Sequence, residues 1–353
     1  MFEIGNKMQL ELAHAKNPTP FENLYIYLTN QCNMRCKHCY LGDRLEEKQE
    51  MPLEMVLNHL SFWRKLGSKK ISFIGGEPTL YPYLREVVES AHSLGYEKVI
   101  INTNLSSKAL AILQTFSSTD FSYIQTSLDG ATIETHDYIR GRGAFVDTTH
   151  SIRQLVQNGF DVRIIATINN ENLGEVSELI TLGEQLGVSL VKFHIMSEIG
   201  NAVKGKVTSV SPYEWISLCN RIDSYIKDTK PSINVSYQPS YVYKTDYENG
   251  KYHDYPGCLG VAKNRMSVFP DGNCYICSFL FDEKISYAKL VDNTIEINDT
   301  SIDHHFENTM CVNCSKDKCA ISPCVAEETV SPGAFCSKYN DLYTLCRLWK
   351  VTV

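Results

Sequence analysis

The sequence lacks the features that mark membrane, secreted and nucleic-acid-binding proteins. No segment of its 353 residues approaches the roughly 20 consecutive apolar residues that cross a membrane. The amino terminus has scattered charges and no apolar segment, so it does not form a secretory signal. No basic run is present, and 34 basic against 41 acidic residues give a net charge of −7, which argues against general electrostatic binding of nucleic acid. We therefore expect a cytoplasmic protein with no membrane or nucleic-acid partner.

Cysteine, in contrast, is abundant. The chain has 13 cysteines, and disulfides are usually transient in cytoplasmic proteins, so metal binding or catalysis must account for them. Three lie within residues 32–39, eight lie between Cys258 and Cys336, and the remaining two are Cys219 and Cys346. This uneven distribution predicts one metal site near the amino terminus and a separate metal-binding region in the last third of the chain.

Short apolar runs alternate with amphipathic helical patterns from residue 24 onward. The predicted strands are 24–29, 70–74, 98–102, 123–128, 162–168 and 190–195. The helical patterns include 53–66, 83–94, 148–158 and 176–186, each followed by a glycine that suits a left-handed cap: Gly67, Gly95, Gly159 and Gly187. Near-continuous apolar strands of this kind indicate a parallel sheet covered by helices. We predict an α/β fold, a partial (β/α)6 barrel with its active-site groups at the carboxyl ends of the strands.

The alternation of predicted strands and helices changes after about residue 200. Ser211 and Pro212 suit the cap and first turn of an amphipathic helix that continues to Thr229. We therefore predict three parts: an N-terminal arm over 1–23, the partial barrel over 24–235, and a cysteine-rich domain over 236–353. A final helix is expected at about 337–349, within the last domain.

The first three cysteines, Cys32, Cys36 and Cys39, follow the first predicted strand with the spacing C-x3-C-x2-C. Structural zinc and electron-transfer clusters usually take four ligands, so three thiolates favour a cluster with one iron open to another ligand. The alternative is a zinc site completed by His38 or by a distant cysteine.

The triplet in this setting, LTNQCNMRCKHCY, resembles the signature of the radical SAM superfamily. The resemblance implies a 4Fe-4S cluster whose open iron binds the amino and carboxylate groups of S-adenosylmethionine (SAM). It also implies reductive cleavage of SAM to a 5'-deoxyadenosyl radical.

Further motifs resemble SAM-binding segments of the same family. Gly75, Gly76 and Glu77 match its GGEP motif, which holds the SAM amino group, and the segment from His136 to Gly141 matches its HDxxRG segment. In that segment Arg140 would pair with the SAM carboxylate, with Arg142 as second candidate. The resemblance further implies ribose contacts from Thr103, Asn104, Ser127 and Asp129, although Thr103 and Asn104 could equally cap turns, and adenine contacts from His38 and Tyr40.

The C-terminal cysteines resemble the SPASM domain, which binds two auxiliary 4Fe-4S clusters. Thirteen residues separate Cys258 from Gly272 and four separate Gly272 from Cys277, and the later run departs from the family spacing by one residue at Cys319. The resemblance assigns the outer cluster to Cys311, Cys314, Cys319 and Cys336, and the inner one to Cys258, Cys277 and Cys324 with Cys274 as the natural fourth ligand. Two zinc sites are the alternative use of these eight thiolates.

These resemblances imply a radical SAM enzyme with one SAM and three 4Fe-4S clusters. The leading expectation is hydrogen abstraction from a peptide and its oxidative modification, such as a crosslink formed in ribosomal peptide maturation. The peptide would bind directly or be presented by a separate leader-binding protein, and a flavodoxin or ferredoxin would supply electrons. A dehydrogenase or epimerase of a small molecule is the alternative, and a non-catalytic iron-sulfur or zinc protein is a remote one. Weak catalytic candidates are Cys219, Cys346, Asp271 and Asp282.

Overall fold

The computed structural model describes residues 21–257, 259–260, 263–277, 280, 286–291, 294–297, 339, 341–346 and 351–352. Most of the predicted N-terminal arm lies outside this set. So do several residues predicted to bind metal or to act in catalysis: Cys258, Asp282, Cys311, Cys314, Cys319, Cys324 and Cys336.

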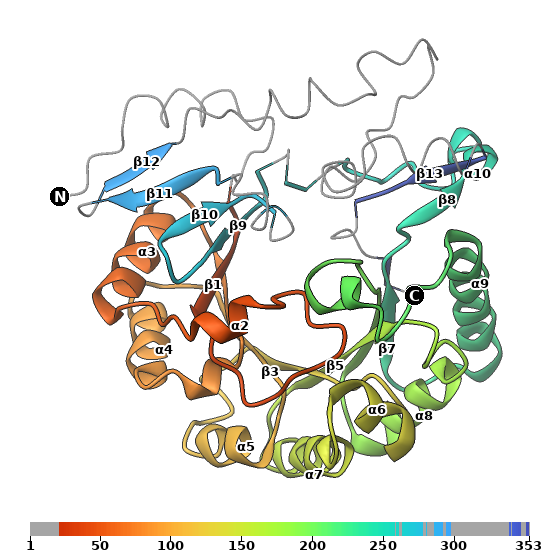
Figure 1. The fold of residues 1–353 in the computed structure, drawn as a ribbon, viewed down its shortest axis with the longest axis horizontal. Helices are drawn as coiled ribbons and strands as arrows, with labels where there is room; N and C mark the ends of the chain where they lie inside the picture. Colours follow the sequence, from red (N-terminus) through yellow and green to blue (C-terminus); the bar gives the residue numbers. More distant parts are fainter. Residues whose placement is uncertain are drawn as a thin grey trace.

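All six predicted strands form one parallel sheet in chain order, which confirms the predicted α/β class and the partial barrel (Figure 1). The strand limits agree with the prediction to within one residue at each end. The strands are β1 (Asn23–Thr29), β2 (Lys70–Gly75), β3 (Lys98–Thr103), β4 (Tyr123–Ser127), β5 (Val162–Ile168) and β6 (Leu190–Ile195).

The sheet continues beyond these six strands on both sides. β7 (Asn234–Tyr237) pairs in parallel with β6, and β9 (Arg265–Val268) pairs in parallel with β1. Three antiparallel strands extend the β9 edge: β10 (Asn273–Tyr275), β11 (Ala288–Val291) and β12 (Thr294–Ile297). Strands β9 to β12, which lie after the boundary predicted near residue 235, therefore belong to the same sheet as the barrel.

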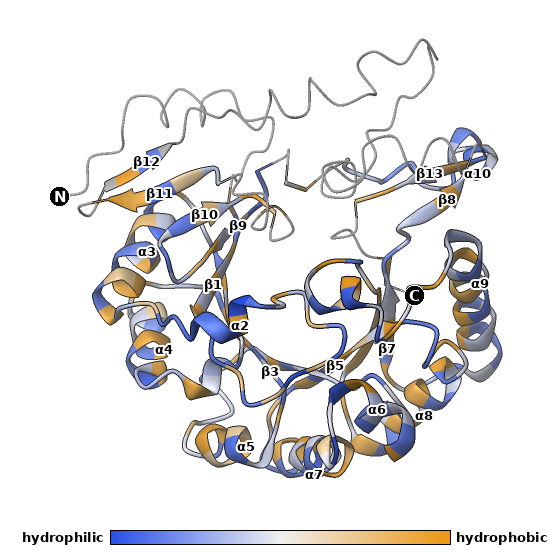
Figure 2. Cartoon of the chain, in the orientation of Figure 1, coloured by the Kyte–Doolittle hydropathy of each residue, from blue (hydrophilic) through white to orange (hydrophobic). Residues whose placement is uncertain are grey.

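Helices cover the outer face of the sheet (Figure 1). Each presents a hydrophobic stripe toward the strands, and Trp63 and Trp215 are fully buried there (Figure 2). The predicted glycines Gly67, Gly95, Gly159 and Gly187 all have positive φ, which confirms their positions at helix ends. The helices are α3 (Leu53–Lys65), α4 (Leu84–Ser93), α5 (Ser107–Leu113), α6 (Ile133–Arg140), α7 (Ala144–Gln157), α8 (Val176–Leu186) and α9 (Pro212–Thr229).

Helix α9 begins where the sequence predicts. The Ser211 side chain accepts a hydrogen bond from the Glu214 backbone N–H, and the Glu214 side chain accepts one from the Ser211 N–H. This reciprocal capping box satisfies two backbone donors that a helix end leaves free, and Pro212 fits the first turn because it has no N–H to satisfy.

The inner face of the barrel is polar. Gln125 on β4 donates to Asn102 Oδ1 on β3, over 2.5 Å, and the buried Lys192 on β6 lies 3.3 Å from Gln125 Oε1. On β5 the buried residues alternate with half-buried ones such as Arg163 and Thr167. The alternation gives the strands an apolar face toward the helices and a polar face toward the barrel interior.

The predicted C-terminal helix at 337–349 is wrong over the residues that the structure describes there. Leu342–Thr344 instead form strand β13, which pairs antiparallel with β8 (Tyr241–Tyr243). The aromatic and β-branched side chains of this segment fit a paired strand, so long-range pairing overrides the weak helical pattern. The remaining short elements here are α10 (Lys244–Glu248) and β14 (Val351–Thr352), which pairs with β7. None of the helices so described is both long and apolar enough to cross a membrane.

Candidate functional site

The cysteine triplet lies in the loop that leaves the carboxyl end of β1 and leads to the short helix α2 (Arg44–Glu47). Cys36 is buried, and Cys32 and Cys39 are half-buried. Burial raises the pKa of Cys32 to about 12 and that of Cys36 to about 11, and the three sulfurs lie close enough to repel one another as thiolates. These thiols therefore lose their protons readily only when a positively charged ligand binds them.

Nitrogen donors lie near two of the three sulfurs, those of Cys32 and Cys36. The Met34 N–H lies 3.4 Å from Cys32 Sγ and Asn104 Nδ2 lies 3.9 Å from it, while Arg140 Nη1 lies 3.8 Å from Cys36 Sγ. Hydrogen bonds to sulfur and a nearby positive charge are the groups that stabilise thiolates as cluster ligands. The residues of the loop thus fit an iron-sulfur cluster.

The end of β2 packs directly on the cluster loop. The Gly76 N–H donates to Thr29 O and the Glu77 N–H donates to Gln31 O, each over 2.8 Å. A Cβ on Gly75 would lie 2.3 Å from Thr29 O, and one on Gly76 would lie 2.2 Å from Gln31 O. Both positions accept only glycine because the two backbones are in contact.

Glu77 is fully buried and its carboxylate joins two segments of the chain. It accepts hydrogen bonds from Thr79 N and Oγ1 in the turn η1 (Pro78–Leu80), from Thr103 Oγ1 at the end of β3, and from Asn104 N. Burial raises the pKa of Glu77, and these hydrogen bonds act against the rise. The carboxylate thus fixes the loops after β2 and β3, and Asn104 in turn contacts Cys32.

Asp129, after β4, connects Arg140 and His38. Its Oδ2 accepts from Arg140 Nε over 2.5 Å and lies 2.8 Å from His38 Nε2, while its Oδ1 accepts from the Thr167 N–H of β5. Burial alone would raise the pKa of Asp129, but Arg140 and His38 hold it well below its ordinary range. His38 Nε2, a potential zinc ligand in the alternative hypothesis, is therefore directed at a carboxylate.

Other predicted SAM contacts lie near these groups with less defined roles. Ser127 is half-buried at the end of β4, in register with Ile165 of β5. Tyr40 donates its hydroxyl hydrogen to the Tyr27 hydroxyl over 2.9 Å, and Tyr27 stacks on Phe269. Tyr40 is thus tied to β1, next to the cluster loop.

The structure adds Asn201, which the sequence reasoning missed. It lies in the turn η2 (Gly200–Lys204) after β6, where its backbone N–H donates to Cys39 O over 2.8 Å and its side-chain Nδ2 donates to Cys36 O over 3.1 Å. A Cβ on Gly200 would lie 2.5 Å from Cys39 O, so this turn also needs glycine. No local pattern connects residues this far apart in the chain, so only the tertiary structure reveals the contact.

Three of the four weak catalytic candidates, Cys219, Cys346 and Asp271, lie among the residues that the structure describes. Cys219 is buried on α9 in the apolar core, and burial raises the pKa of its thiol. Cys346 is buried outside any helix, and its N–H donates to the Tyr255 hydroxyl. Asp271 accepts two hydrogen bonds from Asn273 in the turn before β10.

Of the cysteines assigned to auxiliary clusters, Cys274 and Cys277 are described. Cys274 is fully buried in β10, opposite Val268 of β9, and Cys277 is half-buried just after the same strand. Both are thus carried by the antiparallel extension of the barrel sheet. Their assignment as ligands stays a prediction.

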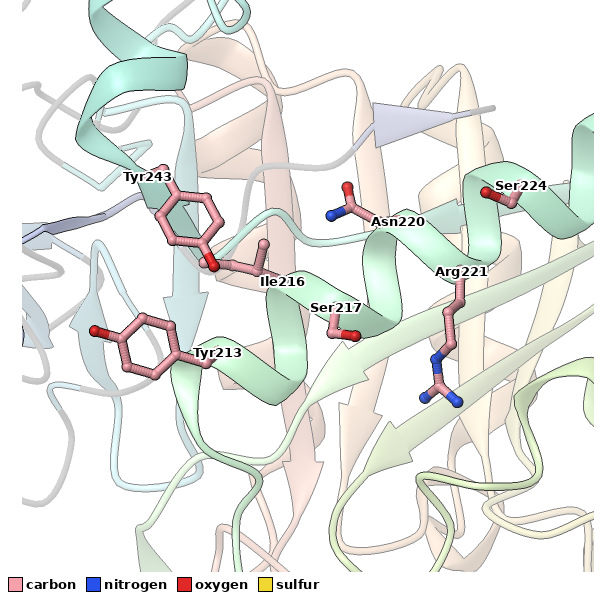
Figure 3. A pocket seen from close by; sticks show the side chains of 7 residues that line it. All are labelled: Tyr213, Ile216, Ser217, Asn220, Arg221, Ser224 and Tyr243. Carbon is pink, nitrogen blue, oxygen red and sulfur yellow. The ribbon is translucent and has the colours of Figure 1, made fainter.

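A cavity of about 410 Å³ lies along one side of α9 (Figure 3). It contains none of the predicted site residues. Tyr213 and Tyr243 stand at one end and Arg221 and Ser224 lie toward the other (Figure 3). Its lining is Tyr213, Ile216, Ser217, Asn220, Arg221, Ser224 and Tyr243.

Comparison with known proteins identifies the family. The Radical SAM superfamily model matches residues 26–183, which include the cysteine triplet, the GGEP motif and Arg140. A "Probable GTP 3',8-cyclase" of Saccharolobus solfataricus is 31% identical over 280 residues, 77% of this chain and 87% of that protein. The chain belongs to the radical SAM superfamily.

Two further similarities concern peptide-modifying proteins. The mycofactocin maturase MftC of Mycobacterium tuberculosis is 30% identical over 166 residues, and the chain spans only 42% of its length. The crystal structure of Streptococcus suis SuiB bound to precursor peptide SuiA has the same fold, with a TM-score of 0.63 and 18% identity over 80% of this chain and 65% of that one.

The contact between β2 and the cluster loop gives a direct test. We predict that Gly76→Ala displaces the loop, because the new Cβ would lie 2.2 Å from the backbone oxygen of Gln31. Overpacking of this kind costs about 1–3 kcal/mol, so the melting temperature should fall by several degrees and iron bound per chain after reconstitution should fall with it.

Gly174→Ala is the matched control, because a Cβ at Gly174 meets no atom within 4 Å. It should retain wild-type iron content and melting temperature. Equal iron content and stability in the two variants would contradict the proposed contact.

Proposed function

We propose that the chain is a radical SAM enzyme that abstracts hydrogen from a peptide and leaves an oxidative modification such as a crosslink. The observation that carries the proposal is the loop of three thiols, one buried and two half-buried, with Arg140 Nη1 3.8 Å from Cys36 Sγ. A bound 4Fe-4S cluster would supply the electron that cleaves SAM to methionine and a 5'-deoxyadenosyl radical. We further propose a cytoplasmic location.

The residues around the loop would bind and orient SAM. Because the Glu77 carboxylate already accepts four hydrogen bonds within the protein, we propose that the backbone of Gly75 to Glu77 receives the SAM amino group and that the Glu77 side chain maintains the backbone shape. Arg140 would bind the SAM carboxylate, since a planar guanidinium matches a carboxylate.

Asp129 and its neighbours would act beside Arg140. Asp129 fixes the Nε edge of the guanidinium, which leaves the Nη atoms for other partners. Ser127 and Asn104 would line the ribose, and His38 and Tyr40 the adenine, as the resemblance implies. Asp129, with both carboxylate oxygens in hydrogen bonds, is better suited to positioning Arg140 and His38 than to a ribose contact.

The peptide substrate rests on the similar proteins. MftC is a maturase by name, and SuiB is seen with its precursor peptide. The polar inner face of the barrel supports such a substrate, because Lys192, Gln125 and Asn102 offer hydrogen-bonding groups to a peptide backbone. A separate leader-binding protein, where one is needed, would present the peptide.

A second candidate function has its own support. The GTP cyclase relative, which its name places with a nucleotide substrate, aligns over a much larger share of this chain than the maturase does. The larger aligned share supports the alternative function, which is dehydrogenation or epimerisation of a small-molecule substrate. A non-catalytic iron-sulfur or zinc protein is the most remote of the alternatives.

The C-terminal cysteines would hold two auxiliary 4Fe-4S clusters and so bring the total to three. Cys274 and Cys277, close together in sequence on the extended sheet, would ligate the inner cluster with Cys258 and Cys324. Such clusters could accept the electron released when a substrate radical is oxidised. A flavodoxin or ferredoxin would supply the electrons for SAM cleavage.

The first test is the formation of 5'-deoxyadenosine. Reconstituted protein with SAM and dithionite should form it, and Cys36→Ala should abolish it because the cluster loses one of three ligands. The wild type should bind about twelve iron atoms per chain, the content of three four-iron clusters. If the wild type formed no 5'-deoxyadenosine, both enzyme functions would fail, and about four iron atoms would leave the C-terminal cysteines to another metal.

The second test separates Arg140 from Arg142. We predict that Arg140→Lys weakens SAM binding about tenfold, or about 1.4 kcal/mol, because an ammonium cannot contact Asp129 and a carboxylate with the same fork geometry. Arg142→Lys, a control two residues away on an exposed loop, should change the Kd less than twofold. Equal losses in the two variants, or a larger loss for Arg142→Lys, would show that Arg140 is not the carboxylate ligand.

A further inference from the structure

Three segments far apart in the sequence meet beside the cysteine triplet. The Lys37 N–H donates to Ile139 O near the end of α6, and Lys37 Nζ lies 2.9 Å from the centre of the Tyr138 ring. The Tyr138 hydroxyl donates to Lys206 O, just after η2. We call the surface formed by Lys37, Tyr138, Arg142, Val203, Lys204 and Lys206 the loop face.

The loop face is directly connected to the cluster ligands. Lys37 is the next residue after Cys36, so the surface is one peptide unit from a ligand. On the η2 side, the Asn201 side chain donates to Cys36 O and its backbone N–H donates to Cys39 O. An electron that enters through this face therefore has short covalent and hydrogen-bonded routes to two cluster ligands.

The loop face is positively charged on a chain whose net charge is −7. Lys37, Arg142 and Lys206 form no ion pair with any residue that the structure describes, whereas Lys204 pairs with Asp43 over 2.6 Å. Two further carboxylates lie nearby: that of Glu198, which is exposed, and that of Asp137, which accepts hydrogen bonds from the Gly143 and Phe145 N–H groups. The loop face therefore carries a local excess of positive charge, opposite in sign to the net charge of the whole chain.

Exposed apolar groups lie among these cations. Val203 is 65% exposed and Tyr138 is 46% exposed. Electron-transfer complexes typically bury less than about 1,200 Å² of surface and dissociate quickly, and complementary charge guides their encounter. Two exposed apolar side chains on a surface with four cations fit a weak, transient contact of this kind with an acidic protein.

We propose that the loop face docks a small acidic one-electron carrier protein of the flavodoxin or ferredoxin kind. This rests on the proposed function, because cleavage of one SAM consumes one electron from outside the chain. The carrier is oxidised by one electron, and the C–S bond of the sulfonium breaks to give methionine and a 5'-deoxyadenosyl radical. The carrier reaches the cluster from the side of Lys37 and η2.

The test compares two electron sources in one variant. Lys37→Glu/Lys206→Glu reverses two cations of the loop face. The rate of 5'-deoxyadenosine formation is measured with reduced flavodoxin and, separately, with dithionite, which needs no docking site. We expect the ratio of the flavodoxin-driven to the dithionite-driven rate to fall at least about tenfold at low salt, and the difference from wild type to shrink as salt rises.

Lys98→Glu/Lys227→Glu is the matched control. It changes the net charge equally, and both lysines are exposed, at the start of β3 and in the last turn of α9, at the opposite end of the sheet. Its ratio should stay within about twofold of wild type. An unchanged ratio in the loop-face variant, or an equal fall in the control, would overturn the docking site.

Binding of oxidised flavodoxin keeps this test independent of the proposed function. Titration calorimetry at low salt should give a Kd at least about tenfold weaker for the loop-face variant than for the control variant. If wild type forms no 5'-deoxyadenosine with dithionite, the proposed function fails, and the Kd comparison still decides the docking site. Equal Kd values in the two variants would reject it.

Discussion

The arrangement around the cysteine triplet depends on one buried ion pair, between Arg140 and Asp129. Asp129 accepts from Arg140, faces His38 and accepts from the β5 backbone, so a single carboxylate joins β4, β5, α6 and the cluster loop. The side chain of Asp129 is fully buried and that of Arg140 is 10% exposed, so removal of either partner would leave a buried charge at a cost of about 3–5 kcal/mol. The pair therefore fixes the guanidinium beside Cys36.

Much of the barrel could be predicted from the sequence because its signals are local. Apolar strands, amphipathic helices and the terminal glycines repeat in order along the chain, and the structure confirms them closely. The strands β9 to β12 could not be predicted, because short segments such as Asn273–Tyr275 become strands only through pairing with distant ones. The wrongly predicted C-terminal helix has the same cause, since Leu342–Thr344 pair with β8.

The candidate site shows the same division between local and tertiary information. Motif spacing was sufficient to select Gly76, Glu77, Asp129 and Arg140, and the structure brings the last two into contact. Motif spacing could not separate a residue that contacts a ligand from one that positions another side chain. Asn201 had no signal at all, because its two hydrogen bonds reach the carbonyl groups of residues in a distant part of the chain.

The central claim is that Cys32, Cys36 and Cys39 hold a cluster whose fourth iron binds SAM. Electron-nuclear double resonance on the reduced protein tests it most directly, with SAM isotopically labelled in its amino and carboxylate groups. We predict hyperfine coupling of both labelled groups to the cluster, and its loss together with the cluster in Cys36→Ala. A reduced cluster in the wild type that showed no coupling to either label would contradict the account.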